Sequence, residues 1–417
     1  MDFTLSQEQR AWQLKARQFA EEDIRPLSLA RDRINDAAGT WDWDIIRKGS
    51  RLGFRTLGVP KDWGGPGVDL VTQALVMAEL ARGDSAVSKA FSQNWKWSQL
   101  ITVICTEDQK ERFLKPFLAD YTYLLGGART EPNVGSDHRM TPDNDPATGF
   151  RLKAEREGDT WILNGEKCFI ANGSVGKLFF VSARTNFRVP VMEGSTEFMV
   201  PIDTPGFRIG KKYNKAGWRF YQNAELIFEN ARVPHANVVG DVNGGWKSRT
   251  SDPSQFNDLE LACNALGVCD AAVEMAMQRA RTQCMGGKRL NEHQLVQLKL
   301  HEMHMRTEAL RSYVMRTVWE RDQAVAGDKA LRDSANAGLM MVFSQEVIQR
   351  VTKLNMHIHC AAGGVMKTAA DKLVRDGIIW THLAGDSLSR IKTIKSCKSN
   401  ASSTAATIVR RSTSTRR

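Results

Sequence analysis

The sequence predicts an α+β protein built of helices, then strands, then helices. Apolar residues recur at helical spacing from Leu5 to about Leu118, at strand spacing from about Tyr123 to Val239, and at helical spacing again from about Asp258 to Ser396. A chain of 417 residues is too long for one ordinary core. The predicted parts are an N-terminal helical domain at 1–122, a middle β domain at 123–240, a C-terminal helical bundle at 241–398 and a tail at 399–417.

Four stretches of the first part have the amphipathic pattern of helices: QRAWQLKARQFAEEDI, WDWDIIRKGSRLG, VDLVTQALVMAELARG and EDQKERFLKPFLAD. The Pro- and Gly-rich segment VPKDWGGPGVD separates two of them, because these residues interrupt regular structure. We therefore expect several short helices in this part.

The middle part contains five strand-like runs separated by Gly, Asn and Pro: FRLKAERE, TWILNGEKCFI, KLFFVSART, EFMVPID and NAELIFENARV. We expect these strands to be antiparallel. The dipeptide Asn164-Gly165 is typical of a tight turn, which would bring the next strand back beside the loop at 128–139.

Two long helical patterns follow, LELACNALGVCDAAVEMAMQRARTQ and EHQLVQLKLHEMHMRTEALRSYVMRTVWERDQAVA. A β domain between two helical layers leaves a cleft where sheet loops meet helix ends. Such clefts are common places for a cofactor.

The composition is that of an ordinary globular protein, with 42% hydrophobic and 25% charged residues. No apolar run approaches the roughly 20 residues that a membrane-spanning helix needs. The start MDFTLSQEQR lacks the basic and apolar segments of a secretion signal. We therefore expect a cytoplasmic protein.

The seven cysteines are scattered without metal or disulfide spacing, so we expect small buried side chains and no disulfide framework. His357 and His359 point to different helix faces at this spacing, and no metal site is expected. The net charge of +11 rises toward the Ser/Thr-rich tail, which is typical of a disordered, solvated segment. A basic protein also suits a phosphorylated cofactor or thioester carrier, and nucleic acid is not the expected partner.

The irregular stretch ARTEPNVGSDHR, at 128–139, is a candidate ligand loop. Thr130 and Ser136 offer hydroxyl groups, and Gly135 lets the backbone approach a flat or phosphorylated ligand. A second polar turn, in LNGEKCFIANGS, is expected to converge on the same site. The alternative interpretation is two ordinary hairpin turns.

These motifs resemble those of the acyl-CoA dehydrogenase family: TEPNVGSD resembles its flavin loop and KCFIANG its second flavin strand. The segments MDFTLSQEQ, DTPGF, KAGWR, AELIFENARVP, GGKRLNEHQ and AAGGVMKTAADKLVRD are similar to further family segments in the same order. The resemblance implies a helical domain, a β-barrel-like middle domain and a C-terminal four-helix bundle. It also implies one FAD per subunit, in a homo-oligomer that is a tetramer or a dimer.

The resemblance further implies roles for individual residues. Arg129, Thr130, Gly135 and Ser136 would meet the isoalloxazine or the thioester, with Phe169 and Ala171 against the other flavin face. Arg281, Gln294, Gly363 and Gly364 would contact the adenine and pyrophosphate end, partly from a neighbouring subunit. An arginine fork suits phosphate oxygens, and the alternative for Arg281 is a salt bridge on the helix surface. Ser136, Arg219 and Gly385 would contact the substrate, the alternative for Arg219 being an exposed turn.

In the family's usual reaction a carboxylate removes the proton next to the thioester carbonyl while hydride leaves for the flavin. This sequence has Ala384 at the usual position of the base and Asn257 at the other position that the family uses. The neighbouring acids Asp386 and Glu260 are therefore the candidate bases. Ala171 also replaces the hydroxyl residue that usually bonds the flavin, and Cys360 replaces a glutamine near the adenylate.

Three interpretations stay open. The chain is an FAD-dependent acyl-CoA dehydrogenase with a shifted base, it runs flavin monooxygenase, desulfinase or lyase-like chemistry on the same scaffold, or it is an inactive subunit of a heteromeric complex. The stretch AFSQNWKWSQ lies where the family lines its acyl channel with small or apolar residues. It predicts a short, branched, cyclic or polar acyl group. The resemblance implies electron-transferring flavoprotein or oxygen as the electron acceptor.

Overall fold

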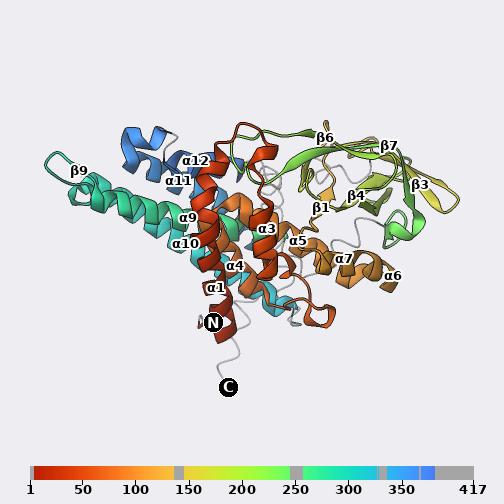
Figure 1. Ribbon diagram of the computed structural model, residues 1–417, viewed down its shortest axis with the longest axis horizontal. Helices are drawn as coiled ribbons and strands as arrows, with labels where there is room; N and C mark the ends of the chain where they lie inside the picture. The colour runs from red at the N-terminus through yellow and green to blue at the C-terminus, as the bar shows by residue number, and fades with distance from the viewer. Residues whose placement is uncertain are drawn as a thin grey trace, which may run out of the picture.

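The computed structural model describes residues 4–135, 145–244, 257–325, 327, 336–365 and 368–380. Figure 1 shows a central body of helices, a β unit on one side and a long pair of helices projecting on the other. In the part that the structure describes, no helix is long and apolar enough to cross a membrane.

The N-terminal part is helical, as predicted. Its elements are α1 (Gln7–Phe19), η1 (Ala20–Ile24), α2 (Arg25–Asp32), η2 (Ala38–Thr40), α3 (Trp43–Arg51), η3 (Phe54–Thr56), η4 (Lys61–Trp63), α4 (Leu70–Gly83), α5 (Ser85–Ile104), α6 (Glu107–Gln109), η5 (Lys110–Leu114) and α7 (Lys115–Ala119). Side-chain caps fix several starts: Ser6 and Thr106 form capping boxes, and Asp69 accepts from the amide of Thr72.

Helix α5 is buried along most of its length, on polar as well as apolar positions. Its sequence therefore lacks the one-sided apolar stripe from which the other helices could be recognised. This is why the sequence did not single it out as a helix.

The middle part forms one eight-stranded sheet with the order β6-β7-β3-β2-β4-β5-β8, and β1 pairs with β4. The strands are β1 (Leu125–Ala128), β2 (Lys153–Glu157), β3 (Thr160–Ala171), β4 (Leu178–Arg184), β5 (Ser195–Pro201), β6 (Phe207–Lys212), β7 (Asn223–Pro234) and β8 (Val238–Val239), with η7 (His235–Asn237) before β8. The five predicted strands are confirmed.

The expectation of an antiparallel sheet is wrong at two pairs. Strand β1 runs parallel to β4 with Leu125 opposite Leu178, and the predicted strands β2 and β4 also pair in parallel. Strand β2 pairs with β4 only between Lys153 and Arg184. Strand β2 therefore leaves one edge of the first half of β4 unpaired. Strand β1 pairs with this edge and satisfies its backbone hydrogen-bonding groups.

The sheet curls on itself, which gives the barrel-like middle domain. Phe179 of β4 packs on Phe207 of β6 with ring centroids 5.6 Å apart, although three strands separate these two in the sheet. Trp161 of β3 likewise meets Phe198 of β5 at 5.5 Å. These rings fill the inside of the curved sheet.

The predicted turn at Asn164-Gly165 is wrong. Both residues lie inside β3, where a register shift between Leu163 and Gly165 marks a bulge and Gly165 has a φ of 133°. The Asn164 side chain donates to Asn230 Oδ1 at 3.1 Å and accepts from the Asn230 amide at 2.8 Å. These bonds hold β3 against β7, so the chain continues as a strand. The turn falls instead at Gly158 and Asp159, between β2 and β3.

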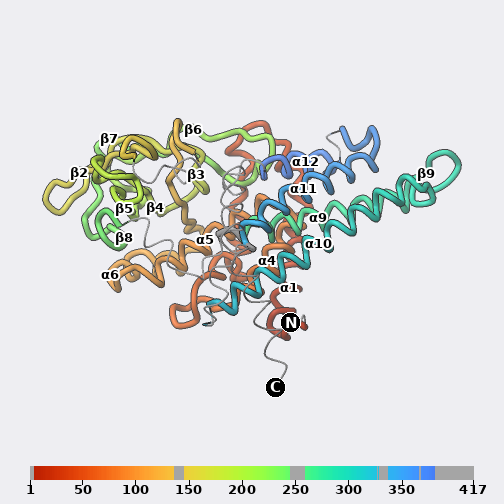
Figure 2. The backbone as a smooth tube through the Cα atoms, turned by 180° about the vertical axis from the view of Figure 1, so that it is seen from behind, coloured from red at the N-terminus to blue at the C-terminus, as the bar shows by residue number. Residues whose placement is uncertain are grey.

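The C-terminal part is a bundle of long helices (Figure 2). Its elements are α9 (Asn257–Thr282), β9 (Cys284–Met285), β10 (Lys288–Arg289), η8 (Leu290–Glu292), α10 (Gln294–Val325), α11 (Asn336–His359), η10 (Cys360–Gly364) and α12 (Ala370–Ile379). Gly267 lets α9 lie directly against α4, because a Cβ there would come within 2.0 Å of the Ala78 carbonyl oxygen. The bundle thus shares one core with the N-terminal helices.

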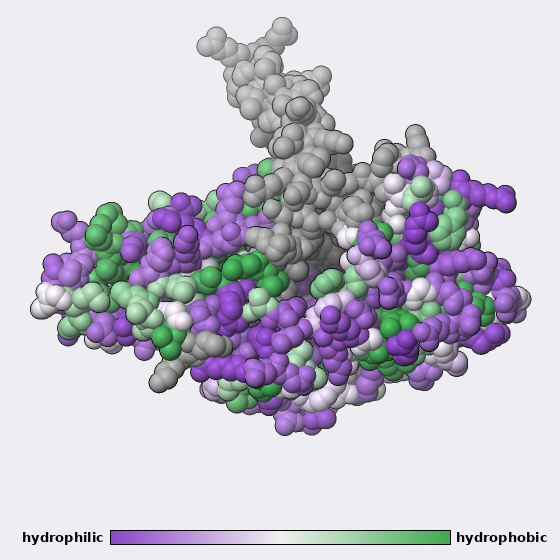
Figure 3. Space-filling model, turned by 90° about the horizontal axis from the view of Figure 1, so that it is seen from above, coloured by the Kyte–Doolittle hydropathy of each residue, from purple (hydrophilic) through white to green (hydrophobic). Residues whose placement is uncertain are grey.

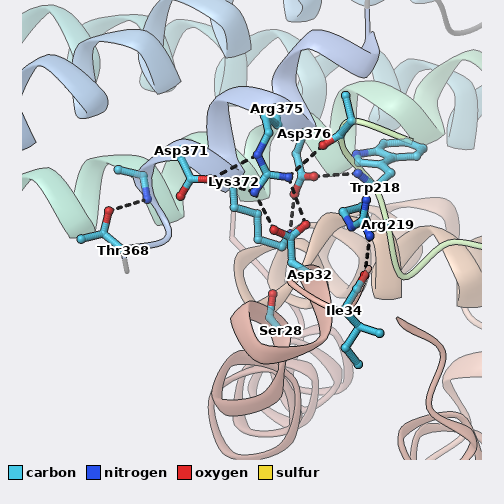
Figure 4. A network of polar contacts seen from close by, with 12 residues as sticks. Ser28, Asp32, Ile34, Trp218, Arg219, Thr368, Asp371, Lys372, Arg375 and Asp376 are labelled. Atoms are coloured by element: carbon cyan, nitrogen blue, oxygen red, sulfur yellow. Dashed lines mark hydrogen bonds and ion pairs between the residues drawn. The ribbon is translucent and has the colours of Figure 1, made fainter. Parts of the chain in front are cut away.

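A polar network joins all three parts at the start of α12 (Figure 4). The Asp376 carboxylate, at the centre, accepts from the Trp218 amide at 2.7 Å, from Ser85 Oγ at 3.1 Å and from Lys372 Nζ at 2.6 Å. Lys372 also pairs with Asp84 at 3.2 Å. Buried charges are stable only when they are paired in this way.

Candidate active site

The loop that follows β1 is fixed by its own backbone and by β3. The Thr130 carbonyl oxygen accepts from the Cys168 amide at 2.8 Å, and Glu131 and Val134 exchange two backbone hydrogen bonds. The Glu131 carboxylate accepts from the amides of Arg151 at 2.6 Å and Leu152 at 2.8 Å. Thr130 and the strand of Phe169 are therefore brought together, as the sequence predicted.

A buried lysine connects this loop to strand β3. Lys167 of β3 donates to Glu131 Oε1 at 2.8 Å and to the Arg129 carbonyl oxygen at 3.1 Å. Burial lowers the pKa of Lys167 to about 8, although the Glu131 carboxylate opposes this shift. Sequence reasoning missed this pair. A charged residue within a core strand, two positions before Phe169, was the available signal.

Phe169 presents an apolar ring on the surface. It has a φ of 54° and is 58% exposed, and its ring stacks on Tyr213 with centroids 4.0 Å apart. The Asn223 side chain donates to the Phe169 carbonyl oxygen at 2.9 Å, which holds this unusual backbone conformation in place. Tyr213 was not predicted from the sequence.

These residues fit an isoalloxazine. An exposed ring backed by a second ring offers a flat apolar face, and the Thr130 loop is held beside it. Ala171, at the end of β3, offers no hydroxyl here. Gly135 closes the described part of the loop, whereas Ser136 lies outside the described residues.

The residues expected at the adenine and pyrophosphate end lie elsewhere. Arg281 and Gln294 are exposed on either side of the β9–β10 hairpin, which in Figures 1 and 2 projects away from the sheet. Gly363 is buried in η10, where a Cβ would come within 2.7 Å of the Met356 carbonyl oxygen, and Gly364 is exposed. A single chain does not bring Arg281 and Gln294 to the Thr130 loop.

A cavity of about 630 Å³ opens between α10, α11 and α12, beside the η10 turn that contains Gly363 and Gly364. Met356 and Cys360 line it beside Lys299, Lys353 and His357. Burial, together with the two lysines and Arg350, lowers the pKa of His357.

Of the two candidate bases, Glu260 is buried on α9 and Asp386 lies outside the described residues, as does Gly385. Glu260 forms an ion pair with Lys89, accepts from Ser92 Oγ at 2.5 Å and lies 3.9 Å from Lys96 Nζ. Burial alone would raise the pKa of Glu260, but the lysines and Ser92 outweigh it and lower that pKa. A carboxylate stabilised in this way is a weak base.

Arg219 is held by the protein's own oxygens. It donates to Asn214 Oδ1 at 2.6 Å and to the Lys215 carbonyl oxygen at 3.1 Å, and it also donates to the carbonyl oxygens of Ile34 at 2.5 Å and Asn35 at 3.4 Å. Its neighbour Trp218 is buried, with a φ of 52° and its ring nearly perpendicular to that of Trp380. The arginine thus joins the middle domain to the N-terminal domain.

A curved β unit that carries an exposed aromatic ring lies on one side of the shared helical core, so the expected position between two helical layers is wrong. The fold and this ring suit a flavin-binding oxidoreductase. Family models for the N-terminal, middle and C-terminal domains of acyl-CoA dehydrogenases match residues 6–120, 126–231 and 243–396. The chain belongs to the acyl-CoA dehydrogenase family. It is therefore an oxidoreductase with FAD as its cofactor, which confirms the expected class.

Individual proteins agree with this assignment. The chain is 30% identical to the probable acyl-CoA dehydrogenase YngJ of Bacillus subtilis, over 90% of this chain and 94% of that protein. It is 28% identical to the solved butyryl-CoA dehydrogenase of Megasphaera elsdenii, with a TM-score of 0.84 over 95% of this chain and all of that one. A chain from the solved electron transferring flavoprotein of Acidaminococcus fermentans is 27% identical, with a TM-score of 0.85 over 95% of this chain and 99% of that one.

Proposed function

We propose that the chain removes two hydrogens from the α and β carbons of a short, branched, cyclic or polar acyl-CoA thioester. The observation that carries this proposal is the hydrogen bond between the Thr130 carbonyl oxygen and the Cys168 amide, which holds the ligand loop beside the exposed Phe169. Bound FAD would supply the hydride acceptor. The name of the similar butyryl-CoA dehydrogenase supports a short acyl group.

The residues of this chain have three tasks in that reaction. Phe169 and Ala171 would hold one flavin face, with Arg129, Thr130, Gly135 and Ser136 toward the other face or the thioester. Donors near the thioester carbonyl would stabilise the negative charge that develops on its oxygen. Gly385 would contact the substrate. Arg219, expected as a second contact, donates to the protein's own oxygens and would position the turn beside the substrate instead of touching it.

Between the two candidate bases we favour Asp386. The pairing of Glu260 with Lys89 lowers its pKa, whereas a base for a carbon acid needs a raised one. Asp386→Asn should therefore stop flavin reduction while leaving thioester binding. Glu260→Gln should keep measurable reduction. If only Glu260→Gln stops reduction, Glu260 is the base.

The test of the proposed reaction is an anaerobic titration of the purified holoenzyme with a panel of acyl-CoA thioesters. Loss of the oxidised flavin absorbance with a short or polar thioester is the expected result. Rapid turnover of long fatty acyl-CoA would contradict the proposed substrate class. An unchanged spectrum with every thioester would contradict the proposed function.

A second candidate function is another flavin reaction on the same scaffold, of monooxygenase, desulfinase or lyase type. Two observations favour it: Glu260 is paired with Lys89, and Ala171 lacks the hydroxyl that usually bonds the flavin. A monooxygenase would need externally reduced flavin and oxygen. An inactive subunit of a heteromeric complex would bind FAD and show neither reaction. The same titration, repeated with reduced flavin and oxygen, separates the three.

We also propose a homo-oligomer, either a tetramer or a dimer. Helix α10 exposes Leu295 (74%), Leu298 (65%) and Met305 (63%), and a second copy could cover them. Figure 3 shows hydrophobic patches among hydrophilic ones on the elongated end of the molecule. Electron-transferring flavoprotein or oxygen is the proposed electron acceptor, and the cytoplasmic location stays a prediction.

A further inference from the structure

Ionic groups occupy the helix that the family resemblance assigns to the acyl channel. Lys89, Ser92 and Lys96 lie at intervals of three and four residues on α5, so they share one helix face. That face meets Glu260 of α9: Lys89 and Ser92 bond its Oε1 atom, and Lys96 Nζ lies 3.9 Å from Oε2. We call these four residues the ion cluster.

Three of the four residues of the ion cluster are deeply buried, and Lys96 is 22% exposed. The side chains of Lys89 and Glu260 are 8% and 3% exposed, and Ser92 is 2% exposed. Taking two charges out of water costs so much that an apolar pair of similar volume is often as stable or more stable. Stability therefore gives no reason for an ion pair at this position, whereas recognition of a ligand does.

The ion cluster has hydrogen-bond donors to spare. A lysine ammonium carries three donors, and among the described residues that of Lys89 makes a single hydrogen bond, to Glu260. Within the same described part of the chain, the buried hydroxyl of Tyr221 has no hydrogen-bond partner. Donors without acceptors are costly in a protein interior.

Tyr221 is linked by ring contacts to the turn of α9 that carries Glu260. Its ring meets Trp218 with centroids 6.0 Å apart, Trp218 meets Trp380 at 4.6 Å, and Trp380 donates to the carbonyl oxygen of Leu261, the residue after Glu260, at 3.2 Å.

Burial raises the pKa of the Tyr221 hydroxyl well above the usual value, and the Glu260 charge adds to this shift. The Tyr221 backbone oxygen accepts from Lys215 at 2.6 Å, which fixes the residue at the entry to β7. Asn264 lies one turn after Glu260 on α9, and its side chain donates to the Ser85 carbonyl oxygen of α5 at 3.0 Å. Among the described residues, the buried Oδ1 atom of Asn264 has no hydrogen-bond partner.

We propose that the ion cluster and the Tyr221 hydroxyl bind an oxygen-bearing substituent of the acyl group, so that the substrate is a polar acyl-CoA with a hydroxyl, oxo or carboxylate oxygen. The inference rests on the proposed acyl-CoA reaction and narrows its substrate. The unfilled donors of Lys89 and Tyr221 require an acceptor, which a plain alkyl chain cannot offer.

The test compares three five-carbon thioesters on the holoenzyme: pentanoyl-CoA, levulinoyl-CoA and glutaryl-CoA. The readout is the concentration of each that gives half of the change in flavin absorbance under anaerobic conditions. At least one oxygen-bearing thioester should act at a concentration roughly tenfold or more below that of pentanoyl-CoA. Levulinoyl-CoA carries a neutral oxo group and glutaryl-CoA an anionic carboxylate. Comparing the two shows which kind of acceptor the site prefers.

Two variants assign the preference to these residues. Tyr221→Phe removes only an unpartnered hydroxyl, so it should fold normally and reduce the preference several-fold. Lys89→Met combined with Glu260→Leu removes the buried ion pair as a unit and should abolish the preference. Lys96 remains, but its side chain is 22% exposed and stays in contact with water. Lys48→Met, the same change at a surface lysine of α3, should leave the preference intact.

The outcomes distinguish the two proposals. If no thioester changes the absorbance, the proposed function falls and this inference with it. If all three act at equal concentrations, or pentanoyl-CoA acts at the lowest, this inference alone is overturned. A preference that survives both Tyr221→Phe and the double substitution also overturns it.

Discussion

Arg375 of α12 donates two parallel hydrogen bonds to the carboxylate of Asp32 at the end of α2, from Nη1 to Oδ1 at 3.2 Å and from Nη2 to Oδ2 at 2.5 Å (Figure 4). The same guanidinium donates to the Ala216 carbonyl oxygen at 2.8 Å and to Asp371 at 2.8 Å. One side chain thus joins the N-terminal, middle and C-terminal parts. The Asp32 side chain is 1% exposed, so its charge depends on this partner.

Arg375→Met should destabilise the protein strongly. It leaves Asp32 buried without its partner, and breaking a buried pair from one side costs about 3 kcal/mol or more. Denaturation by urea, followed by tryptophan fluorescence, measures the loss. The control is Arg208→Met, which breaks the exposed pair with Glu229 and should leave the free energy of unfolding almost unchanged. Equal losses in the two variants would contradict a supporting role for Arg375.

Phe169→Ala should weaken FAD binding while leaving the fold intact. Its ring is 58% exposed and stacks on Tyr213, so it adds little to the core and offers a surface to the cofactor. Loss of one aromatic contact should reduce FAD affinity about tenfold. Fluorescence titration of the protein stripped of its flavin measures this affinity. Phe187→Ala, at another exposed phenylalanine of the middle domain, should have no such effect, and equal losses would count against Phe169 as the flavin shelf.

The predictable parts of the fold were those whose cause is local. The strands around Phe179 and Leu226 follow from their apolar runs and flanking turns, and helix α4 from its spacing. The prediction of a turn at Asn164-Gly165 was wrong because it used only the local turn propensity of this dipeptide. The hydrogen bonds that keep Asn164 in a strand are made to Asn230, which is 66 positions away in the sequence. Tertiary pairing overrode the local preference.

The same distinction holds for the candidate site. The loop of Thr130 and the strand of Phe169 could be predicted because each is a compact motif. The link of Lys167 to Glu131, and that of Lys89 to Glu260, could not be predicted, since each joins residues far apart in the chain. Nothing in a single sequence says which buried lysine faces which carboxylate. The family resemblance gave the frame of the site, and the buried charges came from the structure.

Leu295→Asp should dissociate the proposed oligomer. This residue is 74% exposed on the projecting helix α10, where a charge costs nothing in a monomer but must lose its water in an interface between copies. Light scattering after size-exclusion chromatography measures the mass of the particle. Leu14→Asp places the same charge at a leucine of α1 that is 63% exposed and should leave the mass unchanged. A native mass equal to that of one chain would remove the basis of the prediction.

Lys215 should make the stability depend on pH in a defined window. Burial, reinforced by Arg219 and opposed by Asp376, lowers the pKa of Lys215 from 10.5 to about 7. Between about pH 7 and 10.5 the unfolded chain therefore holds a proton that the native protein has released. Because the unfolded state binds more protons, the contribution of this group to the free energy of unfolding rises with pH, by at most about 1.4 kcal/mol per pH unit.

Urea denaturation of the holoenzyme at several pH values above 7 measures this slope against that of Lys215→Met. The free energy of unfolding of the wild type, minus that of the variant, should increase as the pH rises through the window. Other titrating groups are common to both proteins and cancel in the difference. Lys211→Met, at an exposed lysine of β6, should instead run parallel to the wild type. A difference for Lys215→Met that stays constant or falls with pH would show that the native protein keeps Lys215 charged, because its bonds to the Tyr221 oxygen and to Asn223 Oδ1 would then outweigh burial.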